Sequence, residues 1–492
     1  MKDNSNSIKQ VMVVFIFCFV ALISYIAYFQ VFSATSIAEQ PGNKRIYATS
    51  NEVLRGTIYD REGNALTTSE RIDALTQKRT YTKGDLYVHA LGYNSPIYGA
   101  VGLEANYNKE LSSYSKLQNN FTSLLNDFSI EKLKSMFETR KEDEEKIGNS
   151  VVTTLDPSIQ QVAYNALGNN KGAVVALDPK TGEVLAMVSK PTYNPNDLKA
   201  AIEAANAGTA DDSPLINRAT AGLYPPGSTF KTITLTSALD NIGGITNRTF
   251  EDDGKIVFND GNSLSNANNA VYGTIDLKEA FKVSSNVVFG TLAMELGNDK
   301  LKATAESYGF NNSIEANGFT IENSRFPTLK ESEVGSIAQT GIGQSSILAT
   351  PIQMALVSST IANDGKMMEP TLVSKIIDKD GNVVRTIAPK LRKQVLSSSN
   401  ASIIKEYMKN LVDSKISGSW SYFTGTDAAG KTGTADYNLP DGTPAKPHSW
   451  FIGFAPADNP KIALAVIVEN GGYGSTAAAQ VAGTVINTAL SK

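Results

Sequence analysis

The stretch YPPGSTFK at residues 224–231 is the part of the chain around which the rest is organised. Its two prolines and glycine predict a sharp turn, and the apolar spacing that follows predicts a helix whose first turn carries Ser228. Ser228 and Lys231 share one face of such a helix, with Cβ atoms about 5–6 Å apart. A lysine whose pKa is lowered by burial can take the proton of a serine hydroxyl. The stretch therefore predicts a nucleophilic serine with a lysine base.

A second short motif, SSN, lies at residues 284–286 between apolar residues of helical character. The hydroxyl of Ser284 can relay a proton during a transfer reaction. The amide of Asn286 can hold a substrate carbonyl or the amine of Lys231.

A third motif, KTGT, lies at residues 431–434 in an extended stretch. Such a strand can pair with a substrate peptide through main-chain hydrogen bonds. Gly433 lacks a side chain, so we expect a ligand to lie directly against the backbone there. Thr432 and Thr434 point to one side, and their hydroxyls, with the charge of Lys431, are suited to hold a carboxylate.

Each motif also has a second occurrence that predicts ordinary structure. S-x-x-K recurs at Ser113 and Ser129 in polar stretches, and Ser398-Ser399-Asn400 resembles the start of a helix. Lys180-Thr181-Gly182 is predicted to be the tip of a hairpin. The informative feature is the order S-x-x-K, S-x-N, K-T-G within one domain, each in a fitting local context.

Composition limits the classes of protein that are possible. A chain of 492 residues is long enough for about two or three domains. The net charge of −4, without a dense basic cluster, argues against a nucleic-acid partner. One cysteine, Cys18, excludes an intrachain disulfide, and with two histidines a structural zinc site is not expected.

The N-terminal residues predict a membrane anchor. Residues 1–10 form a short polar tail with two lysines, and residues 11–32 are almost entirely apolar, which is long enough to cross a hydrocarbon core of about 30 Å. A cleavable signal peptide is the alternative, but its apolar region is normally about 7–15 residues. We therefore expect one uncleaved transmembrane helix, a cytoplasmic N-terminus and everything after residue 33 outside the cytoplasm.

The remainder divides at about residue 150. Residues 33–150 contain a predicted hairpin at residues 55–66 and a glutamate, Glu104, that is expected to lie against nearby backbone or arginine groups. From residue 151 the pattern becomes that of mixed helices and short strands. Strands are predicted at residues 151–154, 173–177, 184–188, 450–454 and 462–468, with helices after Asp156-Pro157 and near the C-terminus.

Together the three motifs resemble those of the penicillin-recognising serine acyltransferases, namely penicillin-binding proteins and active-site serine β-lactamases. RGTIYDREGNAL at residues 55–66 is similar to the R-G-x-I-x-D-R-x-G signature of class B penicillin-binding proteins. GAVGLE at residues 99–104, followed by Tyr107, resembles their second N-terminal box, and residues 339–344 and 448–456 also resemble family stretches. The resemblance covers nearly the whole chain and is closest to the short monofunctional penicillin-binding protein A type.

This resemblance implies an α/β (α+β) fold. Residues 151–492 would form a serine β-lactamase/transpeptidase-like domain, with a five-stranded antiparallel sheet flanked by helices. Residues 33–150 would form a small pedestal without catalysis of its own. The protein would be a single-pass protein of the bacterial cell membrane, with a polytopic glycosyltransferase as a possible partner.

The resemblance also implies a role for each motif residue. Ser228 would be acylated by a peptidoglycan stem peptide or a β-lactam, Lys231 would be its base, and Ser284 would pass the proton to the leaving amine. The other implied roles are donor positioning by Asn286, positive charge from Lys431, substrate binding by Thr432, Gly433 and Thr434, and an oxyanion hole from the backbone N–H groups of Ser228 and Thr434. No metal or cofactor would be needed.

Three alternatives stay open from the sequence. A serine β-lactamase shares the acylation step. Class A enzymes deacylate with the glutamate of an E-x-x-x-N loop, and Glu295, Glu315, Glu322 and Glu331, which follow the second motif, lack an asparagine four residues on. A D,D-carboxypeptidase differs only in using water in place of an acceptor amine. The third alternative is a non-catalytic, membrane-anchored β-lactam sensor or cell-wall scaffold. His448 is expected to be a structural histidine.

Overall fold

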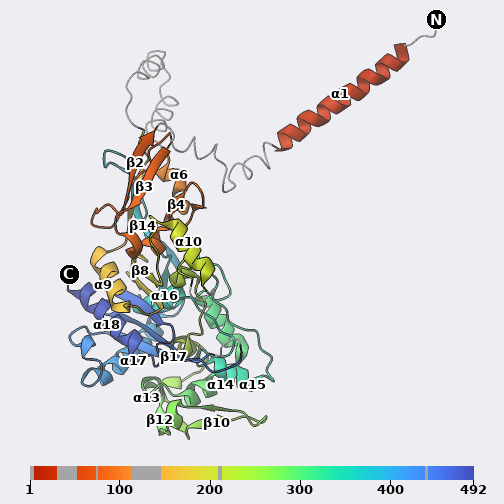
Figure 1. Cartoon of the computed structure of the whole chain (residues 1–492). Helices are drawn as coiled ribbons and strands as arrows, with labels where there is room; N and C mark the ends of the chain where they lie inside the picture. Colours follow the sequence, from red (N-terminus) through yellow and green to blue (C-terminus); the bar gives the residue numbers. More distant parts are fainter. Residues whose placement is uncertain are drawn as a thin grey trace.

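The computed structural model describes residues 5–29, 52–73, 76–113, 146–208, 213–437 and 441–491 (Figure 1). Of the tail expected at residues 1–10, residues 1–4 lie outside the described part of the chain. Of the segment expected at residues 33–150, residues 33–51, 74–75 and 114–145 lie outside it. All three sequence motifs are within the described residues.

A five-stranded antiparallel sheet forms the centre of the catalytic region, in the order β17–β18–β19–β7–β8. Its strands are β7 (Gly172–Leu177), β8 (Val184–Lys190), β17 (Ala429–Ala435), β18 (His448–Ala455) and β19 (Ile462–Val468). β7, β18 and β19 are buried at every residue, which explains their nearly continuous apolar sequences. β17 carries the KTGT motif at the edge of the sheet, so one side of its backbone is not paired within the sheet.

Helices cover this sheet. α9 (Pro157–Leu167) and α18 (Ala477–Leu490) pack on each other, α9 against β7 and β8, and α18 against β18 and β19. α16 (Pro351–Ala362) lies against β7, β18 and β19 and is buried at every residue. It is covered in turn by α11 (Arg218–Ala221) and α17 (Ser398–Ile416), and α17 also packs against β17.

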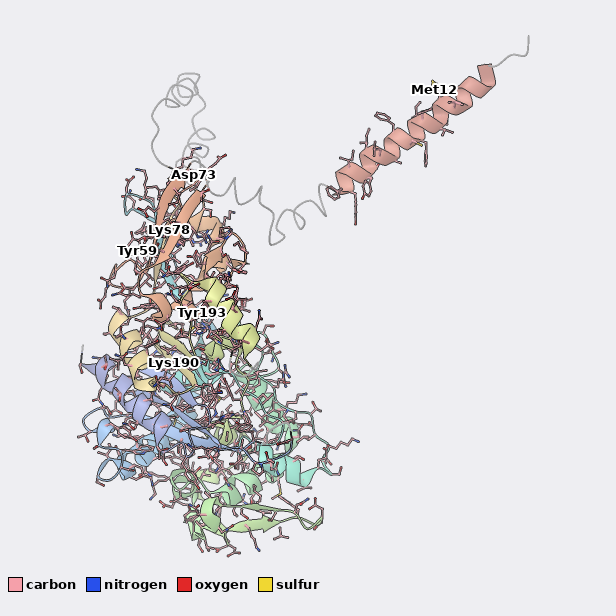
Figure 2. All side chains as sticks on the ribbon, viewed as in Figure 1. Met12, Tyr59, Asp73, Lys78, Lys190 and Tyr193 are labelled. Atoms are coloured by element: carbon pink, nitrogen blue, oxygen red, sulfur yellow. The ribbon has the colours of Figure 1, made fainter. Side chains whose placement is uncertain are left out.

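The apolar stretch near the N-terminus lies in helix α1 (Ser5–Tyr28), which has 24 residues. Its large apolar side chains from Val11 to Ile26 are exposed, and Figure 2 shows them along the helix with Met12 labelled. Among the residues that the structure describes, no helix has both the length and the apolar content needed to cross a membrane. The transmembrane helix expected at residues 11–32 is therefore not confirmed: the helix ends at Tyr28, and residues 30–32 lie outside the described chain.

A second sheet joins the chain before and after residue 150. It has four strands in the order β1–β6–β14–β15. β1 (Ile58–Tyr59) pairs in parallel with β6 (Ser150–Thr153), and β6 pairs antiparallel with β14 (Val373–Ile377), which pairs with β15 (Val383–Thr386). The N-terminal segment and the catalytic region are thus connected by backbone hydrogen bonds as well as by the chain.

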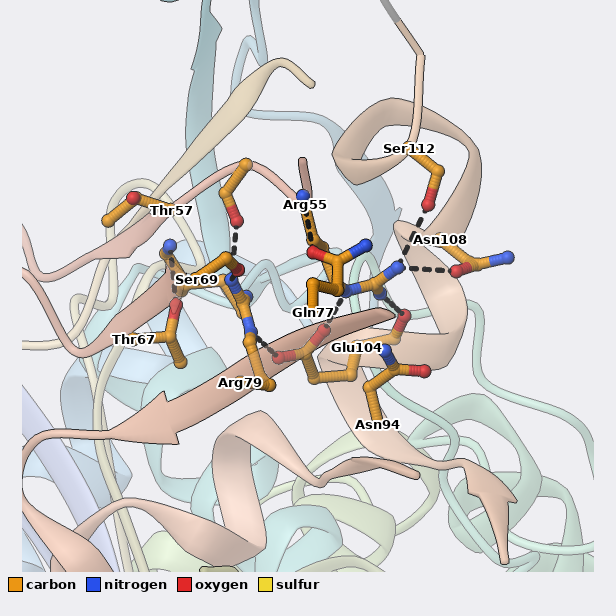
Figure 3. A network of polar contacts seen from close by, with 12 residues as sticks. Arg55, Thr57, Thr67, Ser69, Gln77, Arg79, Asn94, Glu104, Asn108 and Ser112 are labelled. Atoms are coloured by element: carbon orange, nitrogen blue, oxygen red, sulfur yellow. Dashed lines mark hydrogen bonds and ion pairs between the residues drawn. The ribbon is translucent and has the colours of Figure 1, made fainter. Parts of the chain in front are cut away.

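The hairpin predicted at residues 55–66 is present, because Tyr59 forms an antiparallel bridge with Ala65 across a turn. A second hairpin follows, made of β2 (Thr67–Asp73) and β3 (Thr76–Tyr81). These two hairpins carry the arginines of a buried polar cluster (Figure 3).

The buried cluster is centred on Glu104, in the short helix α5 (Gly102–Asn106) (Figure 3). Its carboxylate is 0% exposed and accepts hydrogen bonds from Arg55 Nε at 2.6 Å, Arg79 Nε at 2.8 Å and the Tyr81 hydroxyl at 3.1 Å. Burial by itself would raise the pKa of Glu104, but Arg79 and Arg55 hold it below its ordinary value. Of the two partners expected for this glutamate, backbone or arginine groups, the structure shows the arginines.

We predict that Glu104→Gln lowers the free energy of unfolding by about 3–5 kcal/mol, because two buried guanidinium groups lose their counter-charge. Urea denaturation at neutral pH measures this loss. Since the folded-state pKa of Glu104 is depressed, its contribution is present above the ordinary carboxyl pKa and is lost as pH falls through the folded value.

Glu110→Gln is the matched control for this substitution. Glu110 pairs with Arg385 at 3.0 Å on the surface, with side chains 24% and 52% exposed. The control should change stability by only about 0–1 kcal/mol. Equal losses in the two variants would contradict a special role of the buried cluster.

Candidate active site

The YPPGSTFK stretch folds into a short 3-10 turn, η5 (Gly227–Phe230), that continues into helix α12 (Lys231–Asn241). Ser228 is the second residue of the turn, and Lys231 is the first residue of the helix. Residues three apart eclipse each other in 3-10 geometry, so both side chains face the same way. The structure thus moves Ser228 from the first turn of the α-helix, where the sequence predicted it, to the 3-10 turn before it.

Two glycines bring strand β17 against this turn. A Cβ atom on Gly227, whose φ is +53°, would lie 2.5 Å from the carbonyl oxygen of Thr434. A Cβ atom on Gly433 would lie 2.8 Å from the carbonyl oxygen of Pro226. The missing side chain of Gly433 thus makes room for the turn that carries the serine.

The SSN motif connects two helices, α13 (Leu277–Lys282) and α14 (Asn286–Ser307). The N–H of Ser285 donates to the carbonyl oxygen of Ala280 at 2.9 Å, and the N–H of Ser284 donates to that of Phe281 at 3.2 Å. This pair of bonds is a Schellman cap, whose left-handed position is usually a glycine. Ser284 occupies that position with a φ of +59°. The helix end therefore fixes the direction of the Ser284 hydroxyl.

Lys231 faces the SSN motif from inside the protein. It is 0% exposed, and its Nζ lies within hydrogen-bond distance of the Ser284 carbonyl oxygen at 2.6 Å, of Ser284 Oγ at 3.1 Å and of Asn286 Oδ1 at 2.8 Å. Burial first, and then the charge of Lys431, hold the pKa of Lys231 well below its ordinary value, while Asp252 opposes that shift. A neutral amine at this place is able to accept a proton.

Lys431 approaches Ser284 from strand β17. It is also 0% exposed, and its Nζ donates to Ser284 Oγ at 2.9 Å and to the carbonyl oxygen of Thr432 at 3.1 Å. Burial lowers the pKa of Lys431 to about 7, so this amine carries a proton part of the time near neutral pH. The Ser284 hydroxyl thus lies between two buried amines and can exchange a proton with either.

A cavity of about 680 Å³ opens in front of these groups. It is lined by five of the predicted site residues: Ser228, Ser284, Asn286, Thr432 and Thr434. The remaining three lie behind this wall, since Lys231 and Lys431 are buried against Ser284 and Gly433 packs on the serine turn. The structure therefore brings together all eight residues that the three motifs supplied.

The cavity also contains residues that the sequence analysis did not single out, namely Asn266, Asn268, Asp436, Lys446 and Tyr473. Asn266 is tied most directly to a motif, because its Oδ1 accepts from the backbone N–H of Asn286 at 2.7 Å. Asn268 lies in the short 3-10 helix η7 (Ala267–Asn269), and the others lie outside the helices and strands, without a recognisable spacing. No pattern in the sequence marks them.

His448 has the structural surroundings that the sequence analysis expected. Its ring stacks on Tyr437 with centroids 4.3 Å apart, and its Nδ1 accepts from the backbone N–H of Asn470 at 3.2 Å. Burial lowers the pKa of His448 to about 4, so the ring is neutral at physiological pH.

The groups that meet at the cavity define a class of protein. A serine at a helix start, a buried amine beside it and an edge strand able to pair with a peptide form the site of a serine acyltransferase. Within the described residues, no cluster of three or more His, Cys, Asp or Glu side chains is suited to a metal ion.

Comparison with known proteins identifies the family. The model of the penicillin binding protein transpeptidase domain matches residues 172–487, and that of the penicillin binding protein A dimerisation domain matches residues 55–132. The chain is 33% identical over 485 residues to the peptidoglycan D,D-transpeptidase PbpA of Mycolicibacterium smegmatis, with 95% of this chain and 94% of the relative covered. It is 27% identical over 444 residues to the peptidoglycan D,D-transpeptidase MrdA of Escherichia coli K12, covering 81% and 69%.

Solved structures agree with this assignment. Penicillin-binding protein A from M. tuberculosis, as an imipenem acyl-enzyme complex, has a TM-score of 0.79 and 30% identity, covering 90% of this chain and 100% of that one. The D,D-transpeptidase domain of a peptidoglycan glycosyltransferase from Eggerthella lenta has a TM-score of 0.76 and 35% identity, covering 89% and 99%. The chain belongs to the penicillin-binding protein transpeptidase family, which confirms the resemblance of its motifs.

The left-handed backbone at Ser284 leads to a prediction about stability. We expect Ser284→Gly to unfold with a free energy about 0.5–1 kcal/mol higher than Ser284→Ala, because glycine adopts this conformation without steric cost. Both variants lack the hydroxyl, so the loss of its hydrogen bonds cancels in the comparison. Parallel urea denaturation measures the difference, and equal stabilities would argue against strain at this residue.

Proposed function

We propose that this protein is a peptidoglycan D,D-transpeptidase that cross-links stem peptides through an acyl-enzyme on Ser228. β-Lactams would acylate the same serine. The observation that carries the proposal is the contact of the Ser284 hydroxyl with the amines of Lys231 and Lys431, beside the cavity that Ser228 lines. Relatives named D,D-transpeptidases and a related acyl-enzyme complex support it.

In the acylation step, Ser228 Oγ attacks the carbonyl carbon of the penultimate D-alanine while the Lys231 amine takes the hydroxyl proton. The low pKa of Lys231 supports this assignment, because it leaves the amine free to accept a proton. Backbone N–H groups of Ser228 and Thr434 are assigned to the developing oxyanion. The turn and β17 lie close enough for this pairing, given the contact of Gly227 with Thr434.

In the next step the carbon–nitrogen bond to the terminal D-alanine breaks. The proton held by Lys231 passes through the Ser284 hydroxyl to the leaving nitrogen, so D-alanine departs as a neutral amine. Ser284 Oγ lies 3.1 Å from Lys231 Nζ and 2.9 Å from Lys431 Nζ, which supports its role as the relay. The amine of a second stem peptide then attacks the ester and reverses the proton path.

Substrate binding is assigned to the edge strand. The free side of β17 offers main-chain groups for pairing with the donor peptide. The hydroxyls of Thr432 and Thr434 line the cavity, and with the partial charge of Lys431 they are suited to the terminal carboxylate. Asn286 would position the donor while its Oδ1 holds Lys231.

One observation favours the transpeptidase over a β-lactamase. Among the described residues that line the cavity, Asp436 supplies the one carboxylate, and it is exposed at the end of β17. A hydrolase of the class A type needs a carboxylate that activates water over the ester. A D,D-carboxypeptidase stays a second candidate, since it shares every group assigned above.

The proposal predicts covalent labelling by a fluorescent penicillin. We expect the wild type to carry the label on Ser228, and Ser228→Ala to lose at least about a thousandfold in labelling rate, because no other group takes over the nucleophile. Gel fluorescence with peptide mass spectrometry measures this. Ser113→Ala, which alters a serine of the same S-x-x-K spacing, is the matched control and should label like the wild type.

Product analysis separates the two candidate reactions. Incubation with a native stem-peptide substrate and mass spectrometry of the muropeptides should give cross-linked dimers as the main product. Shortened stem peptides without cross-links would instead identify a carboxypeptidase. A protein that neither labels nor turns over substrate would favour a sensor or scaffold.

The domain limits and the location also belong to this proposal. Residues 33–150 would form a pedestal and residues 151–492 the catalytic domain, working where peptidoglycan lies, outside the cytoplasm. Attachment of residues 11–32 to the bacterial membrane is supported by the exposed apolar side chains of α1. Recovery of the protein in the soluble fraction after cell lysis would contradict attachment.

A polytopic glycosyltransferase is the partner that we assign to the N-terminal part of the chain. Its basis is the resemblance of residues 55–66 and 99–104 to the N-terminal boxes of class B penicillin-binding proteins. Purification in mild detergent should recover both proteins together, and absence of the partner would count against the assignment.

A further inference from the structure

A small lobe lies behind the SSN motif and is built from residues 249–276. It consists of two strand pairs, β9 (Thr249–Asp252) with β12 (Gly273–Asp276) and β10 (Lys255–Val257) with β11 (Ser263–Ser265). β12 runs directly into α13, which leads to Ser284 (bottom of Figure 1). The lobe is therefore joined to the active site by the chain itself.

Asp252, the last residue of β9, is a buried carboxylate with 0% exposure. Its Oδ2 accepts from the Ser285 hydroxyl at 2.5 Å. Its Oδ1 accepts from Asn266 Nδ2 at 2.7 Å and from the backbone N–H of Gly254 at 3.0 Å. A carboxylate without solvent is held in place when several donors satisfy its oxygens, as here.

The two side chains that donate to Asp252, those of Ser285 and Asn266, also accept hydrogen bonds from backbone N–H groups in the first turn of α14. Ser285 caps this helix, since its Oγ accepts from the backbone N–H of Val288 at 2.9 Å. Asn266 Oδ1 accepts from the backbone N–H of Asn286 at 2.7 Å. Negative charge is favourable at a helix N-terminus, so the position of Asp252 suits the start of α14.

The path continues from Asn286 to the base of the reaction. Asn286 Nδ2 donates to the Ser265 carbonyl at 2.8 Å, which fixes the amide orientation and turns Oδ1 toward Lys231 Nζ, 2.8 Å away. Asp252 thus orients Asn286 from behind, and Asn286 orients the amine. We propose that the Asp252 carboxylate is a positioning residue for Lys231. This inference rests on the proposed function of Lys231 as the base.

The charges around Lys231 make this role measurable through the pH dependence of acylation. Two charged groups act on its amine from packed elements: Lys431 on β17, which lowers its pKa together with burial, and Asp252 on β9, which raises it. Tyr272, beside β12, faces Asp252, and the carboxylate adds to the burial that raises the pKa of this phenol. Removing the carboxylate should therefore leave Lys231 neutral down to a lower pH.

A purely structural role of Asp252 is the competing explanation, because loss of a buried hydrogen-bonded group also weakens a fold. The two explanations differ in their effect on the pH profile. A structural loss lowers the amount of active protein at every pH. A change at Lys231 instead moves the acidic limb, which is the part of the plot of acylation rate against pH where the rate falls as Lys231 becomes protonated.

The test uses the whole protein and the second-order rate constant of acylation by a fluorescent penicillin, measured between about pH 5 and 9. We expect Asp252→Asn, which keeps the shape and removes the charge, to move the acidic limb about 0.5–1 pH unit lower. Asp253→Asn is the matched control, because this neighbouring carboxylate is exposed. Its limb should coincide with that of the wild type.

An unmoved limb in Asp252→Asn, or an equal shift in Asp253→Asn, would overturn the inference. Wild-type protein that is not acylated at all would instead refute the proposed function, so the two failures are distinguishable. Ser285→Ala provides a second variant if Asp252→Asn does not fold. It keeps the charge and removes one link, and we expect acylation about tenfold slower with the limb in the wild-type position. A wild-type rate in this variant would also overturn the inference.

Discussion

The Ser284 hydroxyl, held between the buried amines of Lys231 and Lys431, is the interaction on which the site depends. Burial lowers the pKa of both amines, and the charge of Lys431 lowers the pKa of Lys231 further. That constraint turns one lysine into a proton acceptor and leaves the other partly charged. The surrounding structure serves this arrangement, because each of the three groups comes from a different element: α12, the α13–α14 connection and β17.

Much of the fold and site could be predicted from the sequence because local patterns carried the information. The paired strands β7 and β8 follow from two apolar runs around a turn, and α9 follows from Asp156, whose side chain accepts from two backbone N–H groups of the first turn. The motif order predicted the eight residues that meet at the cavity. The resemblance supplied the five-stranded antiparallel sheet, which no spacing in the chain implied.

Other features depend on contacts between distant residues and could not be predicted. Position 433 needs a glycine because the turn that carries Ser228 packs directly against it, and this contact is visible only in the folded structure. The left-handed backbone of Ser284 is set by α13, although serine is not typical of that position. Asn266 and Asp252 lie in a lobe with short, irregular strands, and their partners are 20 and 33 residues away along the chain. The membrane helix, which was expected from composition alone, is not confirmed.

The parallel pairing of β1 with β6 has a consequence for how the molecule comes apart. β6 lies between β1 and β14, so it belongs at once to the fold on either side of residue 150. In a polypeptide that begins at residue 151, β6 would lose its pairing with β1 and become an edge strand. The unpaired backbone groups of such an edge favour association with other chains. Mechanical tension on the amino-terminal part would likewise be borne by β6 and, through β14, by the interior of the larger domain. The two parts should melt as a single cooperative unit rather than one after the other.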